Sequence, residues 1–198
     1  MADFQWHDGL AAARAAAAER GQLVLSYVWA DGCLGCHRMG TVVYPDPEVD
    51  SYLAANFVGL KISLLEKHPD FKEAIGGQPV PWAPTMRFTD GKGREVRRSV
   101  GWLDRSDFLA ELKMAQGQHH LTRWRVDEAL ETFEAIETEH ASTRAAPEAG
   151  YYAGVALFMQ GKRDMAALKS RWNRLREQHP NSDWAYKASV VDDLPADL

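Results

Sequence analysis

The sequence predicts an α/β layer fold over residues 1–117 and an all-α helical-repeat segment over residues 118–198. Helical patterns alternate with short runs rich in Val, Leu, Ile, Phe and Tyr as far as Gly117. Beyond that residue no strand pattern returns, and the periodicity is helical throughout. Because alternating strands and helices favour a mostly parallel sheet, we expect a central mixed sheet with an antiparallel edge, flanked by helices.

The first region begins with a helix and a buried strand. The Ala-rich run from Asp8 to Arg20 predicts a helix that Asp8 caps and Gly21 ends. The next residues, 22–30 (QLVLSYVWA), predict a strand, because β-branched and aromatic side chains favour an extended backbone.

The middle of this region continues the alternation. Residues 36–43 read as helical until two prolines break the pattern. Asp46 and Pro47 suit the cap and first turn of a further helix over residues 48–57. A second strand over residues 57–64 follows, rich in apolar side chains.

A hairpin and a helix complete the α/β pattern. Residues 66–77 predict a short helix and loop, and a strand follows three prolines within residues 78–90. A Gly-Lys-Gly turn leads into residues 94–101 as the hairpin partner. The last helix, residues 104–116, is expected to end at Gly117, which sets the domain boundary there.

The second region reads as four successive helices, over residues 126–140, 148–161, 164–180 and 182–189. Internal similarity links the first with the third at an offset of 38 residues and the second with the fourth at 35. These offsets lie near the roughly 34-residue period of helix-pair repeats. The segment therefore resembles a tetratricopeptide-like array of about two repeats, which implies a possible protein partner on the helical tail.

Charge and composition exclude several classes of partner. The formal net charge is −5, which gives no basic excess for binding a nucleic acid. No apolar run approaches the roughly 18 residues of a membrane span. Asp3 and Asp8 lie where a secretion signal would be basic, so we expect a cytoplasmic protein. We expect no cofactor.

The only two cysteines form a short motif, Cys33-x-x-Cys36, which His37 follows. Cys-x-x-Cys-His is typical of c-type haem attachment, and the Cys-x-x-Cys within it is typical of thiol-disulfide oxidoreductases. Cys33 ends a buried strand and opens a helix, where unpaired backbone N–H groups stabilise a thiolate. Cys36 lies one helical turn behind it, where it can displace a substrate from a mixed disulfide.

Two ordered motifs over residues 5–117 resemble the thioredoxin superfamily. The first is the strand with Trp29 and the cysteine pair, and the second is Trp82-Ala83-Pro84-Thr85. The resemblance implies a thiol-disulfide oxidoreductase in which Cys33 attacks and Cys36 resolves. It also implies a cis Pro84 that faces the disulfide and an Ala83 backbone that pairs with an extended protein dithiol or disulfide substrate. Trp29 and Trp82 would form an apolar rim.

The sequence departs from the family pattern at three places. Leu34-Gly35 replaces Gly-Pro between the cysteines, and Gly32 replaces the usual Trp before the first cysteine. Tyr27 occupies the place of a buried carboxylate that helps proton transfer from the resolving thiol. The segment after the cysteines is closer to a thioredoxin-like branch in which Cys-x-x-Cys-His precedes Asp-Pro-x-Val.

Other interpretations of the motif stay open. A non-catalytic adaptor would use the thioredoxin-like domain as a binding platform and the helical repeats as a peptide groove. A haem site at the cysteines and His37 is less favoured, because the motif lies between a strand and an amphipathic helix. A metal site there is less favoured because the sequence offers no clear fourth ligand. We therefore assign no metal ligand. Trp102 is expected to pack in the core.

Overall fold

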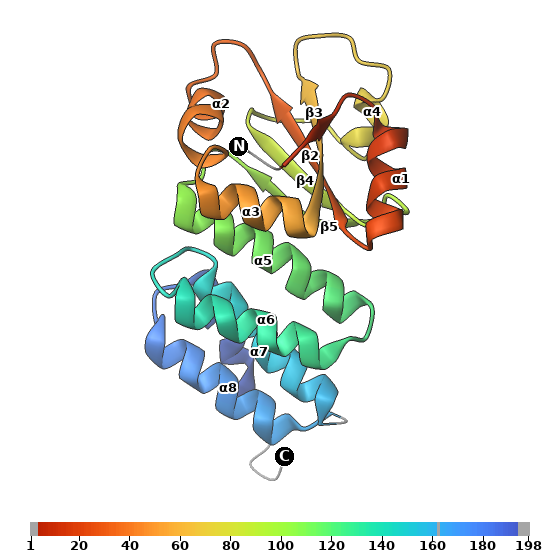
Figure 1. Ribbon diagram of the computed structural model, residues 1–198. Coiled ribbons are helices and arrows are strands. Elements are labelled where there is room, and N and C mark those ends of the chain that lie inside the picture. The colour runs from red at the N-terminus through yellow and green to blue at the C-terminus, as the bar shows by residue number, and fades with distance from the viewer. Residues whose placement is uncertain (1–3, 162, 194–198) are drawn as a thin grey trace. The chain divides into compact units, whose positions relative to one another are not determined.

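A computed structural model describes residues 4–161 and 163–193 of the chain (Figure 1). It divides into two compact units, Met1–Leu109 and Ala110–Leu198. Among the described residues, no helix is both long enough and apolar enough to span a membrane.

The first unit contains a five-stranded sheet in the order β1-β3-β2-β4-β5. Its strands are β1 (Trp6–His7), β2 (Leu23–Trp29), β3 (Phe57–Ser63), β4 (Thr85–Thr89) and β5 (Glu95–Val100). The first three run parallel, whereas β4 is antiparallel to β2 and β5 is antiparallel to β4. The predicted mixed sheet, and the α/β fold class with it, is confirmed.

The edge strand β1 was not predicted. It is only two residues long, and it pairs in parallel with β3 so that Trp6 lies opposite Gly59. A Cβ atom on Gly59 would lie 2.7 Å from the ring atoms of both Phe4 and Trp6. The missing side chain of Gly59 therefore makes room for the aromatic residues of this edge, a pairing that no local pattern reveals.

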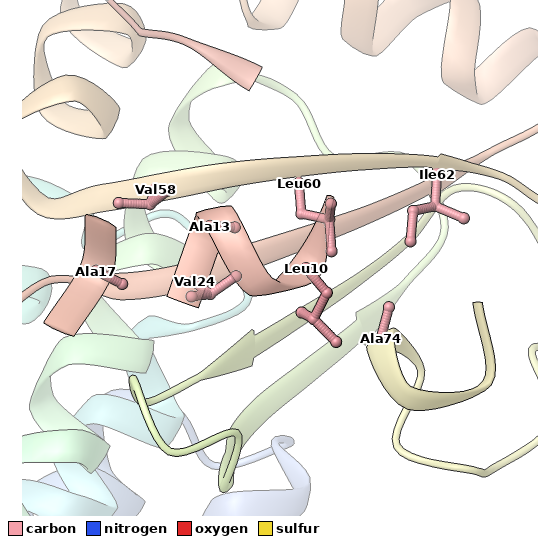
Figure 2. Packing of buried hydrophobic residues seen from close by; sticks show 8 residues of the cluster. All are labelled: Leu10, Ala13, Ala17, Val24, Val58, Leu60, Ile62 and Ala74. Atoms are coloured by element: carbon pink, nitrogen blue, oxygen red, sulfur yellow. The ribbon is translucent and has the colours of Figure 1, made fainter. Parts of the chain in front are cut away.

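Helices cover both faces of the sheet (Figure 1). The helices of this unit are α1 (Leu10–Arg20), α2 (Leu34–Arg38), α3 (Pro47–Asn56) and α4 (Phe71–Ala74). Helix α5 (Arg105–Thr122) begins in this unit and continues into the second. Figure 2 shows the core beneath α1, where Ala13 and Ala17 let the helix lie close to Val24, Val58 and Leu60. The helix after the cysteines widens into a π-helical turn, Met39–Val43. As predicted, Asp46 caps α3 by accepting from the N–H groups of its first turn.

The cap expected for α1 is wrong. Its N-cap residue is Gly9, which has no side chain that could accept a hydrogen bond from the helix. Instead, the Asp70 carboxylate accepts a hydrogen bond of 2.8 Å from the N–H of Leu10, across 60 residues of sequence. His68 holds this loop in place, since its Nε2 lies 2.9 Å from the carbonyl oxygen of Asp8. Asp8 thus contributes its backbone rather than its carboxylate.

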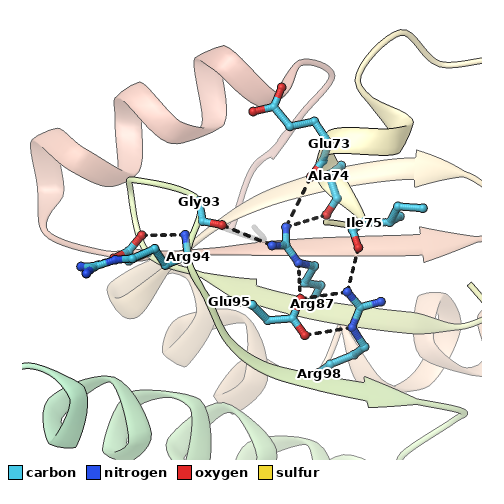
Figure 3. Close-up of polar contacts among 9 residues, drawn as sticks. Glu73, Ala74, Ile75, Arg87, Gly93, Arg94, Glu95 and Arg98 are labelled. Carbon is cyan, nitrogen blue, oxygen red and sulfur yellow. Dashed lines mark hydrogen bonds and ion pairs between the residues drawn. The ribbon is translucent and has the colours of Figure 1, made fainter. Parts of the chain in front are cut away.

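A buried arginine ties α4 to the hairpin (Figure 3). Arg87 of β4 is only 5% exposed. Its guanidinium donates to Glu95 (2.6 Å), to the carbonyl of Ala74 at the end of α4 (3.0 Å) and to the carbonyl of Gly93 in the turn (3.2 Å). Arg98 also pairs with Glu95. One charged side chain therefore satisfies backbone carbonyls that the short helix and the turn leave open.

The predicted helix end at Gly117 is also wrong. Helix α5 continues through Gly117 to Thr122. A Cβ atom at this glycine would lie 2.5 Å from Cε1 of Phe133, so the residue is a point of close helix packing rather than a stop signal. The sequence cannot separate these two uses of glycine, because both depend on what lies beside the residue.

The second unit is helical over its described residues. It contains α6 (Val126–Glu139), α7 (Ala146–Gln160), α8 (Met165–Gln178) and α9 (Asp183–Ala188), at the positions predicted, followed by a 3-10 turn (Ser189–Asp193). Neighbouring helices pack through aromatic and small residues, as where Tyr151 stacks on Trp172 with ring centroids 4.4 Å apart. Close to that stack, a Cβ on Gly154 would lie 2.5 Å from the Trp172 ring. The predicted helical segment is confirmed.

Candidate active site

The cysteine pair lies where β2 gives way to α2. Gly32 has φ +72, a left-handed backbone conformation that residues other than glycine rarely adopt. This residue turns the chain out of the strand. Cys33 then takes the N-cap position of α2. The strand fixes the start of this turn and the helix fixes its end, so the position of Cys33 follows from both elements.

The two cysteines form a disulfide bond, with their Cα atoms 5.2 Å apart. Cys36 is 7% exposed, whereas Cys33 is half-buried. The N–H of Cys36 donates to Sγ of Cys33 over 3.1 Å. Such a donor stabilises negative charge on that sulfur once the bond is reduced. The outer sulfur is therefore the accessible one, and the inner sulfur is covered.

The second motif lies against the first. The peptide bond between Ala83 and Pro84 is cis, as the family resemblance implies. Sγ of Cys33 lies 3.3 Å from the carbonyl oxygen of Ala83. Two hydrogen bonds hold the loop that contains this cis bond. The Thr85 hydroxyl donates to the carbonyl of Trp82 (2.6 Å), and the N–H of Gly101 donates to the carbonyl of Pro84 (2.8 Å).

Gly35, between the cysteines, is in close contact with this loop. A Cβ atom there would lie 3.0 Å from Cδ of Pro84 and 3.2 Å from Cβ of Trp102, closer than most such contacts. The glycine therefore lets the redox turn lie directly on the loop that follows Trp82.

Large apolar side chains are exposed on the redox turn and on the two loops that pack against it. Leu34 is 83% exposed, Trp82 is 70% exposed and Trp102 is 38% exposed. The Arg38 guanidinium lies over the Trp102 ring, 4.4 Å from its centroid. Exposed large apolar side chains next to a reactive group are typical of a surface that meets another molecule.

Tyr27 lies behind the pair, where the family has a carboxylate. Its hydroxyl lies 3.4 Å from the carbonyl oxygen of Cys36, and burial raises its pKa far above the ordinary tyrosine value. Burial and the neighbouring Tyr27 likewise raise the pKa of Tyr44. Both hydroxyls are therefore neutral donors at neutral pH, and neither can accept a proton from the resolving thiol.

A family model described as a thioredoxin-like domain matches residues 10–116. The chain belongs to the thioredoxin-like family. A thioredoxin from Thermus thermophilus is 33% identical, with a TM-score of 0.49, and the match covers 57% of this chain and 86% of that one. A structure named DsbH oxidoreductase is 16% identical, with a TM-score of 0.44 and coverage of 57% and 83%. No curated protein matches the chain.

The thioredoxin-like domain brings together most of the residues singled out from the sequence. Ala83 and Pro84 lie directly against the redox turn that carries the Cys33–Cys36 disulfide. Trp82 is exposed on the same loop. Trp29 lies at the end of β2, half-buried, with the Lys61 ammonium 4.8 Å from its ring centroid. His37 is exposed.

Trp102 was missed by sequence reasoning, which assigned it to the core. The glycine directly before it, Gly101, has φ +98 and bonds to the cis-proline carbonyl, so the chain crosses the redox turn at this point. A tryptophan that follows the last strand of a thioredoxin-like sheet is the signal that could have identified it. Across the residues described, no group of three or more His, Cys, Asp or Glu side chains could hold a metal ion.

Proposed function

We propose that this thioredoxin-like protein is a thiol-disulfide oxidoreductase whose substrates are protein dithiols and disulfides. The observation that carries the proposal is the asymmetry of the Cys33–Cys36 pair. The outer sulfur accepts a hydrogen bond from the Cys36 N–H and lies beside the Ala83 carbonyl, whereas the inner sulfur is buried.

The reaction follows from this asymmetry. In the reduced protein the Cys33 thiolate attacks one sulfur of a substrate disulfide, so that a mixed disulfide forms and the other substrate sulfur leaves as a thiolate. Cys36 then attacks Sγ of Cys33, which releases the second substrate thiol and leaves the protein oxidised. A dithiol donor returns the protein to its reduced form. Because Tyr27 and Tyr44 are neutral, water accepts the proton of Cys36.

Substrate binding is proposed for the loop that faces the disulfide. An extended segment of the substrate would lie along Ala83 and Pro84, which are already held against the redox turn. Trp82, with Trp29 at the end of β2, would contact its apolar side chains. Leu34 extends the same exposed surface.

The tail is proposed to bind a protein partner. We assign this role to residues 118–198 as a tetratricopeptide-like domain that follows the thioredoxin-like domain of residues 1–117. The offsets of 38 and 35 residues support it, because they pair the sequence of α6 with that of α8 and the sequence of α7 with that of α9. The cytoplasmic location likewise stays a prediction.

The two cysteines serve as matched controls for each other. With a disulfide-bonded peptide as substrate, Cys36→Ser should accumulate a mixed disulfide that mass spectrometry detects, because the attacking thiol remains and the resolving thiol is gone. Cys33→Ser should form none, and neither variant should turn over. Equal trapping by both variants, or turnover that neither change affects, would contradict the proposal.

The adaptor interpretation is favoured by one observation, the neutral Tyr27 hydroxyl in place of a proton-accepting carboxylate. It predicts that a partner recovered with the wild-type protein still binds the double Cys33→Ser, Cys36→Ser variant. Loss of all binding in the double variant would count against it.

A further inference from the structure

A cavity of about 740 Å³ opens beside the disulfide. Its walls include four aromatic residues, Trp6, Tyr27, Trp29 and Tyr44, together with both cysteines. This volume lies within the range of roughly 300–1,000 Å³ that small-molecule sites occupy, and such sites are mostly apolar with a few placed polar groups.

The aromatic wall is built by packing between distant segments. Trp6 lies 5.7 Å from Tyr27 and 5.2 Å from Tyr44 between ring centroids, and the two tyrosines lie 5.1 Å apart. Gly59, opposite Trp6 on β3, leaves the space that the indole fills. Because these rings meet edge to face or tilted, they support one another, and a planar ring can pack against their exposed parts.

One polar group of this cavity has unused capacity. The Lys61 ammonium contacts the Trp29 ring, and within the part of the chain that the structure describes it forms no ion pair. A ligand carboxylate would supply the opposite charge that this ammonium lacks.

We propose that this cavity binds a small planar aromatic acid. The ring of the ligand packs against Trp6 and Tyr44, and its carboxylate lies at Lys61. Asp31, the acidic residue among those that line the cavity, opposes the anion and limits its affinity. The proposal does not rest on the oxidoreductase activity, because binding requires neither thiol.

Calorimetry with two matched probes tests this site on the full chain. One is 3-phenylpropionate and the other is its neutral amide, 3-phenylpropanamide, so that they share the ring and differ in charge. We expect saturable binding of the acid with a dissociation constant on the order of millimolar, as its few atoms allow. The amide should bind about two- to fivefold more weakly, since the charge pair is near solvent.

Variants then assign the contacts. Lys61→Met should remove the preference for the acid, whereas Lys92→Met, at an exposed lysine of the β4–β5 turn, should leave it unchanged. Asp31→Asn should tighten binding of the acid more than that of the amide.

The outcomes separate this site from the thiol chemistry. Calorimetry reports binding of the acid without any thiol exchange, so its result does not depend on what the redox assays give. Absence of saturable binding up to about 10 mM, roughly tenfold above the expected constant, would overturn the proposal. So would an unchanged preference for the acid in Lys61→Met, whose exposed side chain can be replaced without disturbing the fold.

Discussion

Arg87 offers a direct test of what holds the hairpin to α4. Replacing it with methionine keeps an apolar stem of similar length and removes the buried guanidinium. Glu95 retains Arg98 as a partner, but the carbonyls of Ala74 and Gly93 lose their donor. The substitution therefore leaves backbone acceptors unsatisfied in a buried position.

The magnitude follows from the contacts shown in Figure 3. Arg87 makes hydrogen bonds to Glu95, Ala74 and Gly93 at 2.6, 3.0 and 3.2 Å. At about 1.5 kcal/mol for each bond to a charged group, their loss costs about 4.5 kcal/mol. The buried methionine returns about 1.5 kcal/mol through its apolar surface. We expect Arg87→Met to lower the free energy of unfolding of this unit by about 3 kcal/mol.

Hydrogen exchange of the β4 amides measures this free energy for the sheet separately from the helical segment. The matched control is Arg94→Met in the same hairpin. Arg94 is 62% exposed, and its partner Asp90 keeps backbone donors from Lys92 and Arg94, so the control should cost at most about 1 kcal/mol. A loss for Arg87→Met no larger than that of the control would refute the reasoning.

Three further changes test individual contacts. Asp70→Ala should destabilise the protein by about 1 kcal/mol in urea denaturation, whereas Asp8→Ala should have little effect, because only the Asp70 carboxylate caps α1. Gly117→Ala should cost about 1–3 kcal/mol by overpacking, whereas Gly40→Ala, with open space around its Cβ position, should be neutral or stabilising in the same denaturation series. Hydrogen bonds from Arg98 and Arg87 lower the pKa of Glu95 below its ordinary 4.5. Ionised Glu95 therefore stabilises the fold at neutral pH, and this contribution is lost as the pH falls below that value. Denaturation at several pH values should show Glu95→Gln less stable than the wild type at neutral pH and the difference disappearing in acid.

Local patterns predicted the elements that carry their own signals. The strand before Cys33 and the helix that Asp46 caps are both where the sequence puts them. A run of apolar and β-branched residues favours an extended backbone in almost any surroundings, and an Asp-Pro pair supplies both cap and first turn. These signals are properties of a few adjacent residues, which is why they survive without tertiary information.

The errors share a different cause. Asp8 and Asp70 are both suitable caps, and only the path of the chain decides which of them meets the N-terminus of α1. Gly117 resembles a helix stop until Phe133 packs against it. The two-residue strand β1 exists because β3 offers it an edge. In each case the outcome depends on a partner far away in the sequence.

By itself, the sequence determined the family of the domain and the three-residue spacing of Cys33 and Cys36, because short-range geometry alone brings two cysteines so spaced within reach of a disulfide. Only the tertiary structure decided what surrounds them. Trp102 contacts Gly35, and Tyr44 reaches the cavity, because the sheet order brings their segments beside the redox turn. Burial, charge and access at the pair arise from contacts between separate segments, and no local pattern encodes these.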